Sequence, residues 1–194
     1  YHEHFSYFSL VAAERIFAAH GLRIFDVEEL WTHGGSIRIH AAHAESAPGE
    51  TSRMTDLRRT EIEIGTETLE YYQAFASRVE QLRRDILTFL IDARNAGKRV
   101  IGYGAPGKGN TLLNYCGIRS DLIEFTVDRN PYKHGRFTPG TQIPIRDPAV
   151  LDIEPCDYVF ILPWNLTDEI TKQLAFLEER GVRFVRPVPA LTVL

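Results

Sequence analysis

A glycine-rich turn in the second half of the chain has the residue types and spacing of a phosphate-binding loop. Gly102, Gly104 and Gly107 fit the pattern G-x-G-x-x-G, between a short apolar run and an expected helix. Backbone N–H groups can approach an anion where side chains are missing, and the following helix N-terminus favours negative charge. Lys108 adds a charge suited to a diphosphate, and Asn110 can cap the helix or donate a hydrogen bond. The alternative is a tight structural turn with a solvated lysine.

An acidic residue ends the next apolar run. Asp128 stands where a nicotinamide-binding fold places the acid that holds a ribose, so a dinucleotide-dependent oxidoreductase is one possible function. Against this function, Pro106 and Lys108 crowd the glycine loop. In a structural interpretation, Asp128 and Asn130 instead build a turn before Pro131.

The stretch that follows, residues 130–141, is irregular and places Lys133 and Arg136 beside aromatic side chains. Loops with cations and aromatic rings at the top of an α/β sheet suit nucleotide bases and phosphates. We therefore predict that Lys133 and Arg136 help the glycine loop to hold a nucleotide. The alternative is a surface loop with exposed charges.

The first residues of the chain form a cluster of titratable side chains. His4 is suited to accept a proton near neutral pH, with Glu3 as its electrostatic partner and Tyr1 as a hydrogen-bond donor. The His-Glu-His spacing does not match a helical zinc motif, so we predict no metal site here. The alternative is an ordinary loop that enters a helix.

These groups need secondary structure to position them. We predict a helix over residues 9–20, strands over 24–31 and 36–43, a polar linker over 46–60 and a long helix over 66–95. Strands over 99–103, 123–128, 158–162 and 183–185 then alternate with helices over 110–116 and 166–180. Such alternation predicts a parallel sheet with helices on both faces, which binds ligands beyond the carboxyl ends of its strands.

The composition is ordinary for a soluble globular protein: 194 residues, 44% hydrophobic and 25% charged, with a net charge of -4. Neither nucleic acid nor a membrane surface is an expected partner. The two cysteines, Cys116 and Cys156, are far apart and predict neither a disulfide framework nor zinc binding, which suits the cytoplasm. The chain starts without methionine, and Met54 is its only one, so we expect a piece of a longer protein.

Five sequence blocks, in this order, resemble a known family: the S-adenosylmethionine-dependent C-methyltransferases that act on nucleotide-linked keto sugars. The blocks are Tyr-His-Glu-His-Phe-Ser-Tyr-Phe-Ser-Leu at 1–10, His-Gly-Gly-Ser-Ile-Arg at 33–38, the glycine loop at 102–111, Val-Asp-Arg-Asn-Pro-Tyr-Lys at 127–133 and Ile-Leu-Pro-Trp-Asn at 161–165. Members of this family resemble one another in having an N-terminal zinc-binding module, a middle methyltransferase domain and a C-terminal α/β domain.

The resemblance implies an α/β fold in which a Rossmann-like parallel sheet domain follows the last helix and antiparallel strand pair of a class I methyltransferase domain. Residues 1–45 would end the methyltransferase domain, 46–60 would be the linker, and 61–194 would bind the nucleotide-linked sugar. The zinc ligands and most of the S-adenosylmethionine site would lie upstream of this chain.

The resemblance also implies roles for individual residues. His4 would remove the proton beside the keto group, with Glu3 polarising it and Tyr1 hydrogen-bonding the sugar. The diphosphate would be held by the loop, together with cations and polar groups of the neighbouring loops: Gly102, Gly104, Gly107, Lys108, Asn110, Asp128, Lys133 and Arg136. A further alternative, a non-catalytic interaction module, would show no pocket at the carboxyl ends of the strands.

Overall fold

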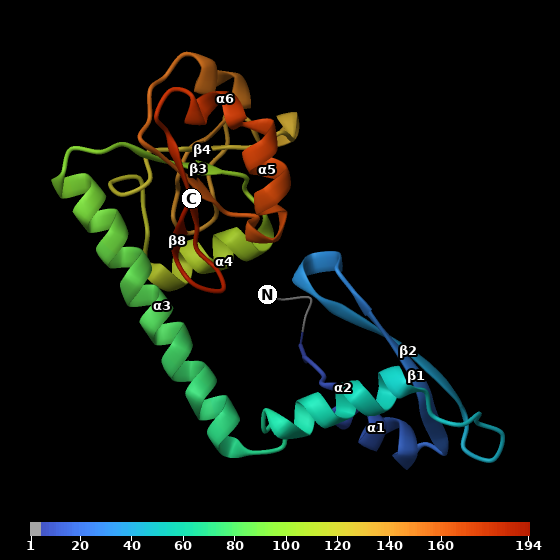
Figure 1. Cartoon of the computed structure of the whole chain (residues 1–194). Helices are drawn as coiled ribbons and strands as arrows, with labels where there is room; N and C mark the ends of the chain where they lie inside the picture. Colours follow the sequence, from blue (N-terminus) through green and yellow to red (C-terminus); the bar gives the residue numbers. More distant parts are fainter. Residues whose placement is uncertain (1–4) are drawn as a thin grey trace. The chain divides into compact units, whose positions relative to one another are not determined.

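The computed structural model describes residues 5–194 (Figure 1). The predicted catalytic residues Tyr1, Glu3 and His4 lie outside the described residues. The chain divides into two compact units: an N-terminal unit that extends to Ser77 and a C-terminal unit from Arg78 to Leu194.

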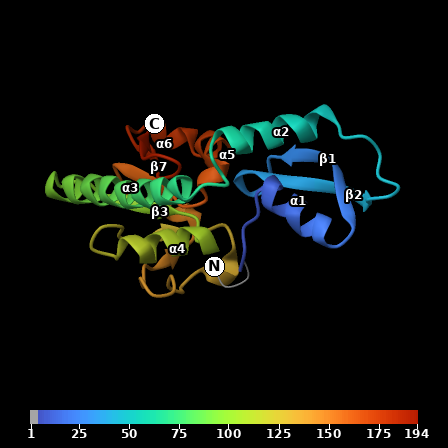
Figure 2. The ribbon, with the colours of Figure 1, turned by 90° about the horizontal axis from the view of Figure 1, so that it is seen from below.

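The N-terminal unit consists of two helices packed against an antiparallel strand pair (Figure 2). Its elements are α1 (Leu10–Ala19), β1 (Leu22–Leu30), β2 (Ser36–His43) and α2 (Ser52–Glu63). The Ser9 side chain caps α1 by accepting the Ala12 N–H, as its position predicts. The strands pair from Leu22 opposite His43 to Leu30 opposite Ser36, so the predicted helix and strand pair are confirmed.

Helix α2 lies where we predicted a polar linker over residues 46–60, and from Ser52 on the structure differs from that prediction. Thr51 caps this helix by accepting the Met54 N–H. Met54 is fully buried. It packs in one cluster with residues of α1 and β1, namely Leu10, Ala13, Ile24 and Val27. The apolar face of α2 is narrow and consists of Met54 and Leu57. The sequence of this segment therefore shows little helical periodicity of its apolar residues.

A carboxylate from α2 also holds the start of α1. Glu61 accepts the backbone N–H of Leu10 at 2.8 Å and that of Val11 at 2.9 Å. These are two of the N–H groups that a helix leaves without an internal partner, and negative charge is favourable at this end. Helix α2 therefore fixes the position of the start of α1.

We expect Met54→Ala to destabilise the N-terminal unit by about 2–5 kcal/mol, because a fully buried side chain would leave a cavity. Hydrogen exchange measured by mass spectrometry should show faster exchange in α1 and β1. Thr55→Ala changes the neighbouring exposed residue of the same helix and should leave that exchange almost unchanged. Equal exchange in the two variants would contradict the packing of α2 onto this unit.

The C-terminal unit is built on a six-stranded sheet. The elements are α3 (Leu69–Asn95), whose later part lies in this unit, β3 (Val100–Tyr103), α4 (Gly107–Cys116), β4 (Thr126–Val127), β5 (Ile145–Arg146), β6 (Tyr158–Ile161), α5 (Thr167–Gln173), α6 (Ala175–Glu178), β7 (Arg183–Arg186) and β8 (Thr192–Val193). Short 3-10 helices occupy Pro131–Lys133, Pro148–Asp152 and Trp164–Leu166 in this unit. A further one occupies Thr32–Gly34 in the N-terminal unit. The strand order is β5-β4-β3-β6-β7-β8, and every pair is parallel except β7 with β8.

The predicted α/β fold with a parallel sheet is confirmed, with local differences. The strand predicted over 123–128 is shortened to β4, and strands β5 and β8 were not predicted. The helix predicted over 166–180 is interrupted at Leu174 and forms α5 and α6. Cys116 and Cys156 are free thiols.

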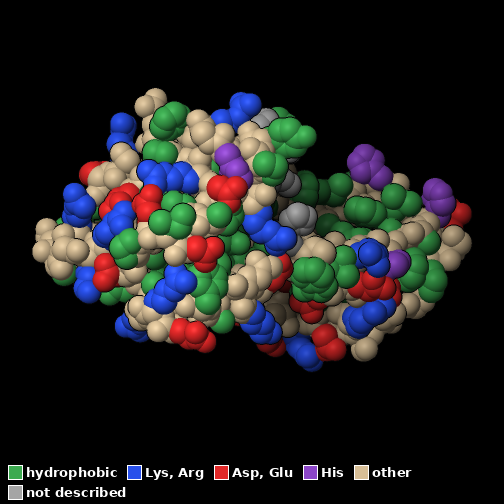
Figure 3. Space-filling view, turned by 90° about the horizontal axis from the view of Figure 1, so that it is seen from above, with side chains coloured by type: hydrophobic (Ala, Val, Ile, Leu, Met, Phe, Trp, Pro, Cys, Tyr) green, Lys and Arg blue, Asp and Glu red, His purple; other side chains and the backbone are tan. Residues whose placement is uncertain are grey.

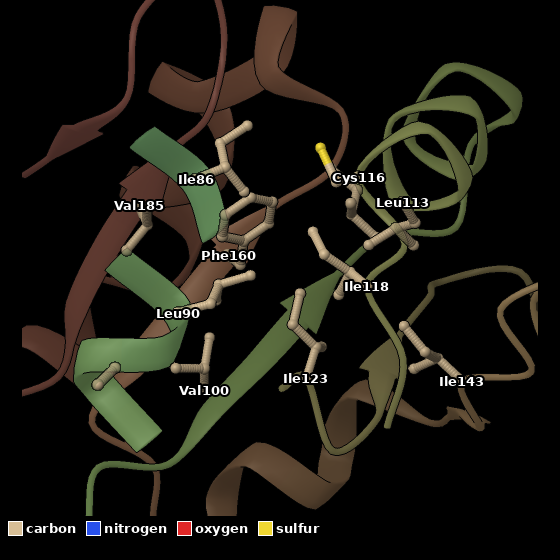
Figure 4. Packing of buried hydrophobic residues seen from close by; sticks show 12 residues of the cluster. Ile86, Leu90, Val100, Leu113, Cys116, Ile118, Ile123, Ile143, Phe160 and Val185 are labelled. Carbon is tan, nitrogen blue, oxygen red and sulfur yellow. The ribbon is translucent and has the colours of Figure 1, made fainter. Parts of the chain in front are cut away.

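Helices cover both faces of the sheet, each with its own apolar cluster. On one face α3 and α4 pack against β3, β6 and β7; Figure 4 shows Ile86 and Leu90 of α3 beside Phe160 of β6. On the other face α5 and α6 bury Ile170 and Leu177 against the strands. The sheet is therefore rigid, and the loops at its carboxyl edge start from fixed points.

The strand order places a topological switch point between β3 and β6. The chain runs from β3 to β4 on one side, and β6 lies on the other side of β3. The loops that follow β3 and β6 therefore diverge at this point, which is where open α/β sheets bind ligands.

Candidate functional site

Two glycines of the glycine pattern, Gly102 within β3 and Gly104 just after it, are required by close packing. Gly104 has a positive φ of 82°, and a Cβ there would lie 2.7 Å from Pro163 Cδ in the loop after β6. A Cβ on Gly102 would lie 2.7 Å from Thr126 Oγ1 of the neighbouring strand. These positions need glycine for the fold alone, so they carry no information about a ligand.

Gly107 is different from these glycines. A Cβ at Gly107 would meet no atom within 4 Å, whereas one on Gly109 would lie 2.8 Å from Leu162 Cβ. Gly107 is exposed and does not have a positive φ. Helix α4 begins at Gly107 and not at Asn110 as we predicted, because the glycine pattern masks the first turn of the helix. The open space beside Gly107 leaves room for a ligand against the first turn of α4.

The N-terminus of α4 has no side-chain cap. Its N-cap residue is Pro106, which offers no side-chain acceptor. The N–H groups of Gly107, Lys108 and Gly109 precede the first hydrogen bond of the helix, which Asn110 donates to Pro106 at 3.0 Å. Helix starts are usually capped by Ser, Thr, Asp or Asn, so three uncapped donors are suited to an anion.

The donors earlier in the loop are already used within the protein. The Gly104 N–H donates to Val127 O at 2.6 Å, and the Ala105 N–H donates to Asp128 Oδ2 at 2.7 Å. Between Gly104 and Gly109, the backbone donors for which the described residues supply no partner are those in the first turn of α4.

Lys108 extends from the first turn of α4 toward the loop after β6. Its ammonium donates a hydrogen bond to the Asn165 side-chain carbonyl and lies 5.0 Å from the centre of the Trp164 ring. Burial lowers the pKa of Lys108. Within the described residues, Lys108 forms no ion pair with an acid. The cation is thus half-buried at a helix N-terminus, the end where positive charge is unfavourable.

Asp128 joins the glycine loop to the turn after β4. Its Oδ2 accepts the Ala105 N–H at 2.7 Å and Lys133 Nζ at 2.9 Å, while Oδ1 accepts the Asn130 N–H at 2.8 Å. Asn130 in turn accepts the Tyr132 N–H, which starts the 3-10 helix at Pro131. This matches the structural interpretation of Asp128 and Asn130 as turn residues, and it gives Lys133 a partner inside the protein.

The pKa of Asp128 follows from these contacts. Burial raises the pKa, but the hydrogen bonds from Lys133, Asn130 and Ala105 outweigh burial and hold the pKa below its usual value. A carboxyl group with a lowered pKa in the folded state stabilises the fold above its unfolded pKa, near 3.8, and this contribution is lost as the pH falls through the folded value.

Asp128→Asn is therefore expected to lower the free energy of unfolding by about 1–3 kcal/mol at neutral pH, because it removes a buried hydrogen-bonded charge. The difference from the unmodified chain should shrink as the pH falls below the usual pKa of 3.8. Urea unfolding at a series of pH values measures both effects. Asp121→Asn, at an exposed acid of the same unit, should show neither effect. A difference that does not depend on pH would contradict the role of the charge.

A pocket of about 210 Å³ opens beside the first turn of α4. Its lining is mostly apolar and comes from α4, the segment 133–139 and the ends of neighbouring strands: Ala105, Asn110, Leu113, Lys133, Arg136, Phe137, Thr138, Pro139, Ile145 and Leu162. Asn110 Oδ1 is buried, and none of residues 5–194 gives it a hydrogen bond. Arg136 is exposed and, in the part of the chain that the structure describes, forms no ion pair. Phe137 is 61% exposed, so a ring face is open to contact.

The structure thus separates the predicted substrate-binding residues by position. Asn110, Lys133 and Arg136 line the pocket, whereas Gly107 and Lys108 lie in the first turn of α4, where Gly107 has open space beside it. Gly102 and Gly104 serve packing, and Asp128 braces the loop together with Lys133. No role was predicted for Trp164 and Asn165, because they lie far from Lys108 in the sequence; Asn165 is 57 positions away.

Three further features of the described residues bear on the sequence predictions: the charge distribution, the metal-binding groups and the length and apolarity of the helices. On the face of the molecule drawn in Figure 3, basic and acidic side chains are interspersed, in line with the small net charge of -4. Residues 5–194 contain no group of three or more His, Cys, Asp or Glu side chains that could hold a metal ion. None of the helices described here combines the length and apolarity that crossing a membrane requires.

Comparison with known proteins places these features in a family. Residues 31–189 match the family model of the C-methyltransferase C-terminal domain. Over 189 residues the chain is 37% identical to the C-methyltransferase NovU of Streptomyces niveus, an alignment that covers 97% of this chain and 45% of that protein. The chain therefore spans less than half the length of this relative.

Proposed function

This chain belongs to the C-methyltransferase family, and from this premise we propose that its C-terminal unit binds the nucleoside diphosphate of a nucleotide-linked keto sugar. The whole protein would then transfer a methyl group from S-adenosylmethionine to a carbon of that sugar. The single observation that carries the binding proposal is the uncapped N-terminus of α4, with a lysine in its first turn that has no acidic partner among residues 5–194.

The electrostatics of this helix start support an anionic ligand. The Lys108 ammonium lies at the same helix start as three backbone N–H donors and the positive end of the helix dipole. Within the described residues, no acid is paired with it. Without a ligand, each of these features lowers the stability of the fold. When an anion binds, each becomes favourable. Departures from the usual capping and charge preferences of a helix start occur in proteins mainly at functional sites.

The neighbouring pocket supports a nucleoside attached to that anion. Its apolar walls and the exposed Phe137 ring suit the face of a base, and the buried Asn110 Oδ1 would accept a hydrogen bond from the ligand. Arg136 at the lining would contribute a second positive charge to the diphosphate. A non-catalytic interaction module was expected to lack a pocket here, and a pocket is present.

The dinucleotide alternative receives less support. It relied on Asp128 to hold a ribose, but both carboxylate oxygens of Asp128 already accept hydrogen bonds from the loop and from Lys133. A ribose would compete with the contacts that shape the glycine loop. We therefore do not propose an oxidoreductase.

For catalysis we propose the roles that the family resemblance implies. His4 accepts the proton from the carbon beside the keto group, and the electrons of that C–H bond form an enolate. Glu3 polarises His4, and Tyr1 donates a hydrogen bond to the sugar. When bound, S-adenosylmethionine supplies an electrophilic methyl group for this carbon. Within residues 5–194, the only glycine loop that follows a parallel strand is in the C-terminal unit, and we assign it to the nucleotide. We therefore assign no S-adenosylmethionine contacts to the described residues. A zinc module remains an expectation.

Binding the diphosphate away from the reacting carbon has a catalytic use. Interactions with a non-reacting part of the substrate orient the sugar and lower the entropic cost of reaching the transition state. A rigid sheet with a fixed loop is suited to this task.

The experiment that tests the binding proposal is calorimetric titration of the 194-residue chain with nucleoside diphosphates of the common bases. We expect binding, and we expect Gly107→Val to weaken it at least about tenfold, which is about 1.4 kcal/mol, because the side chain fills the ligand space. Gly49→Val is the matched control, since Gly49 also has open space and no positive φ. Absence of binding to every nucleoside diphosphate would refute the proposal.

A further inference from the structure

We propose that Trp164 and Asn165 are positioning residues that hold the Lys108 ammonium with uncharged groups only, so that its positive charge stays available to the diphosphate. The inference rests on the proposed function and adds the loop after β6 to the site. The block at 161–165 had no predicted role of its own.

The geometry joins the two loops that diverge at the switch point. Lys108 lies in the first turn of α4, after β3, whereas Trp164 and Asn165 begin the 3-10 helix after β6. Asn165 Oδ1 accepts a hydrogen bond from Lys108 Nζ, and the Trp164 ring centre lies 5.0 Å from the same nitrogen. The close approach of Gly104 to Pro163 and of Gly109 to Leu162 keeps the loops together. The position of the ammonium is therefore set from two sides.

Two other lysines of the chain are paired with carboxylates. The chain has four lysines. Lys98 pairs with Asp157 at 2.8 Å, and Lys133 pairs with Asp128 at 2.9 Å. Lys108 is half-buried like Lys133 but is held by an amide oxygen and a ring face. An amide and an indole orient a cation without neutralising it.

This difference predicts an unusual order of variant effects. An aspartate at position 165 would have nearly the shape of asparagine and would grip Lys108 more strongly, but its charge would cancel the lysine's and repel a phosphate. If Asn165 only stabilised the loop, Asn165→Asp would be the mildest substitution. If it is a neutral anchor, Asn165→Asp must harm anion binding more than Asn165→Ala.

The test is titration of the 194-residue chain with uridine diphosphate and with pyrophosphate. We expect Asn165→Ala to weaken binding about threefold to tenfold, the size of one lost hydrogen bond, and Asn165→Asp to weaken it about tenfold more. In a Lys108→Ala background, Asn165→Ala should have no further effect, since the two residues act as one. The inference is overturned if Asn165→Asp binds these anions as well as Asn165→Ala does.

A second measurement needs no ligand and so separates this inference from the proposed function. Labelling lysine with carbon-13 at the ε position gives one NMR signal for each of the four lysines, and Lys108→Arg identifies that of Lys108. We expect the Trp164 ring to shift this signal and Trp164→Leu to remove the shift. Asn165→Asp should raise the pKa of Lys108. If the chain binds no nucleotide but these changes occur, the proposed function fails while the anchoring holds. If the signal ignores both substitutions, the anchoring is wrong.

Discussion

Replacing His4 by alanine in the whole protein is expected to lower the rate of methyl transfer by about 10²–10⁴-fold, the usual contribution of a positioned base. The reason is that a carbon beside a keto group becomes nucleophilic only after its proton is removed. Single-turnover measurement of methyl transfer to a nucleotide-linked keto sugar reports this step directly. Binding of S-adenosylmethionine and of nucleoside diphosphate should be unchanged, because the proposed role of His4 is confined to the proton.

The matched control is His20→Ala. His20 is an exposed histidine that follows the last turn of α1. It should leave both turnover and binding close to normal. Near-normal turnover of His4→Ala would end the assignment of the base, and equal loss in both variants would point to damage of the N-terminal unit.

Replacing Lys108 by alanine is expected to weaken nucleoside diphosphate binding about 10–100-fold, because a hydrogen bond to a charged group contributes about 1.5–3 kcal/mol. The loss should be greatest at low salt, where charge interactions are least screened. Calorimetric titration at two salt concentrations measures both effects. Binding of the nucleoside without phosphates should change little, since the proposed contact is with the anion.

Two further variants make this result specific. Lys172→Ala removes an exposed lysine of α5 and should leave the affinity unchanged. Lys108→Arg keeps the charge and should restore part of the affinity. If Lys108→Ala binds nucleoside diphosphate as tightly as the unmodified chain, the anion site cannot be at the start of α4 as proposed.

The chain's local patterns were sufficient to predict most of its elements, although not α2. The helical spacing over residues 66–95 and the strand–loop–helix order around Gly104 depend on neighbours in sequence, and both occur in the structure. The antiparallel pair of β1 and β2 followed from alternation around a Gly-Gly turn. The two-residue strands β5 and β8 could not be predicted, because their existence depends on the neighbouring strands alone.

The sequence by itself determined the fold class, the glycine loop and the family, because each can be recognised from the local spacing of residues or from the order of motifs. Only the tertiary structure decided how the loop's residues divide their work. Asp128 braces Ala105, Lys108 reaches Asn165, and α2 joins the N-terminal unit through Met54. The physical reason is that a charged or buried side chain takes its partner from whatever the fold brings within a few ångströms, and that distance is not encoded by position along the chain.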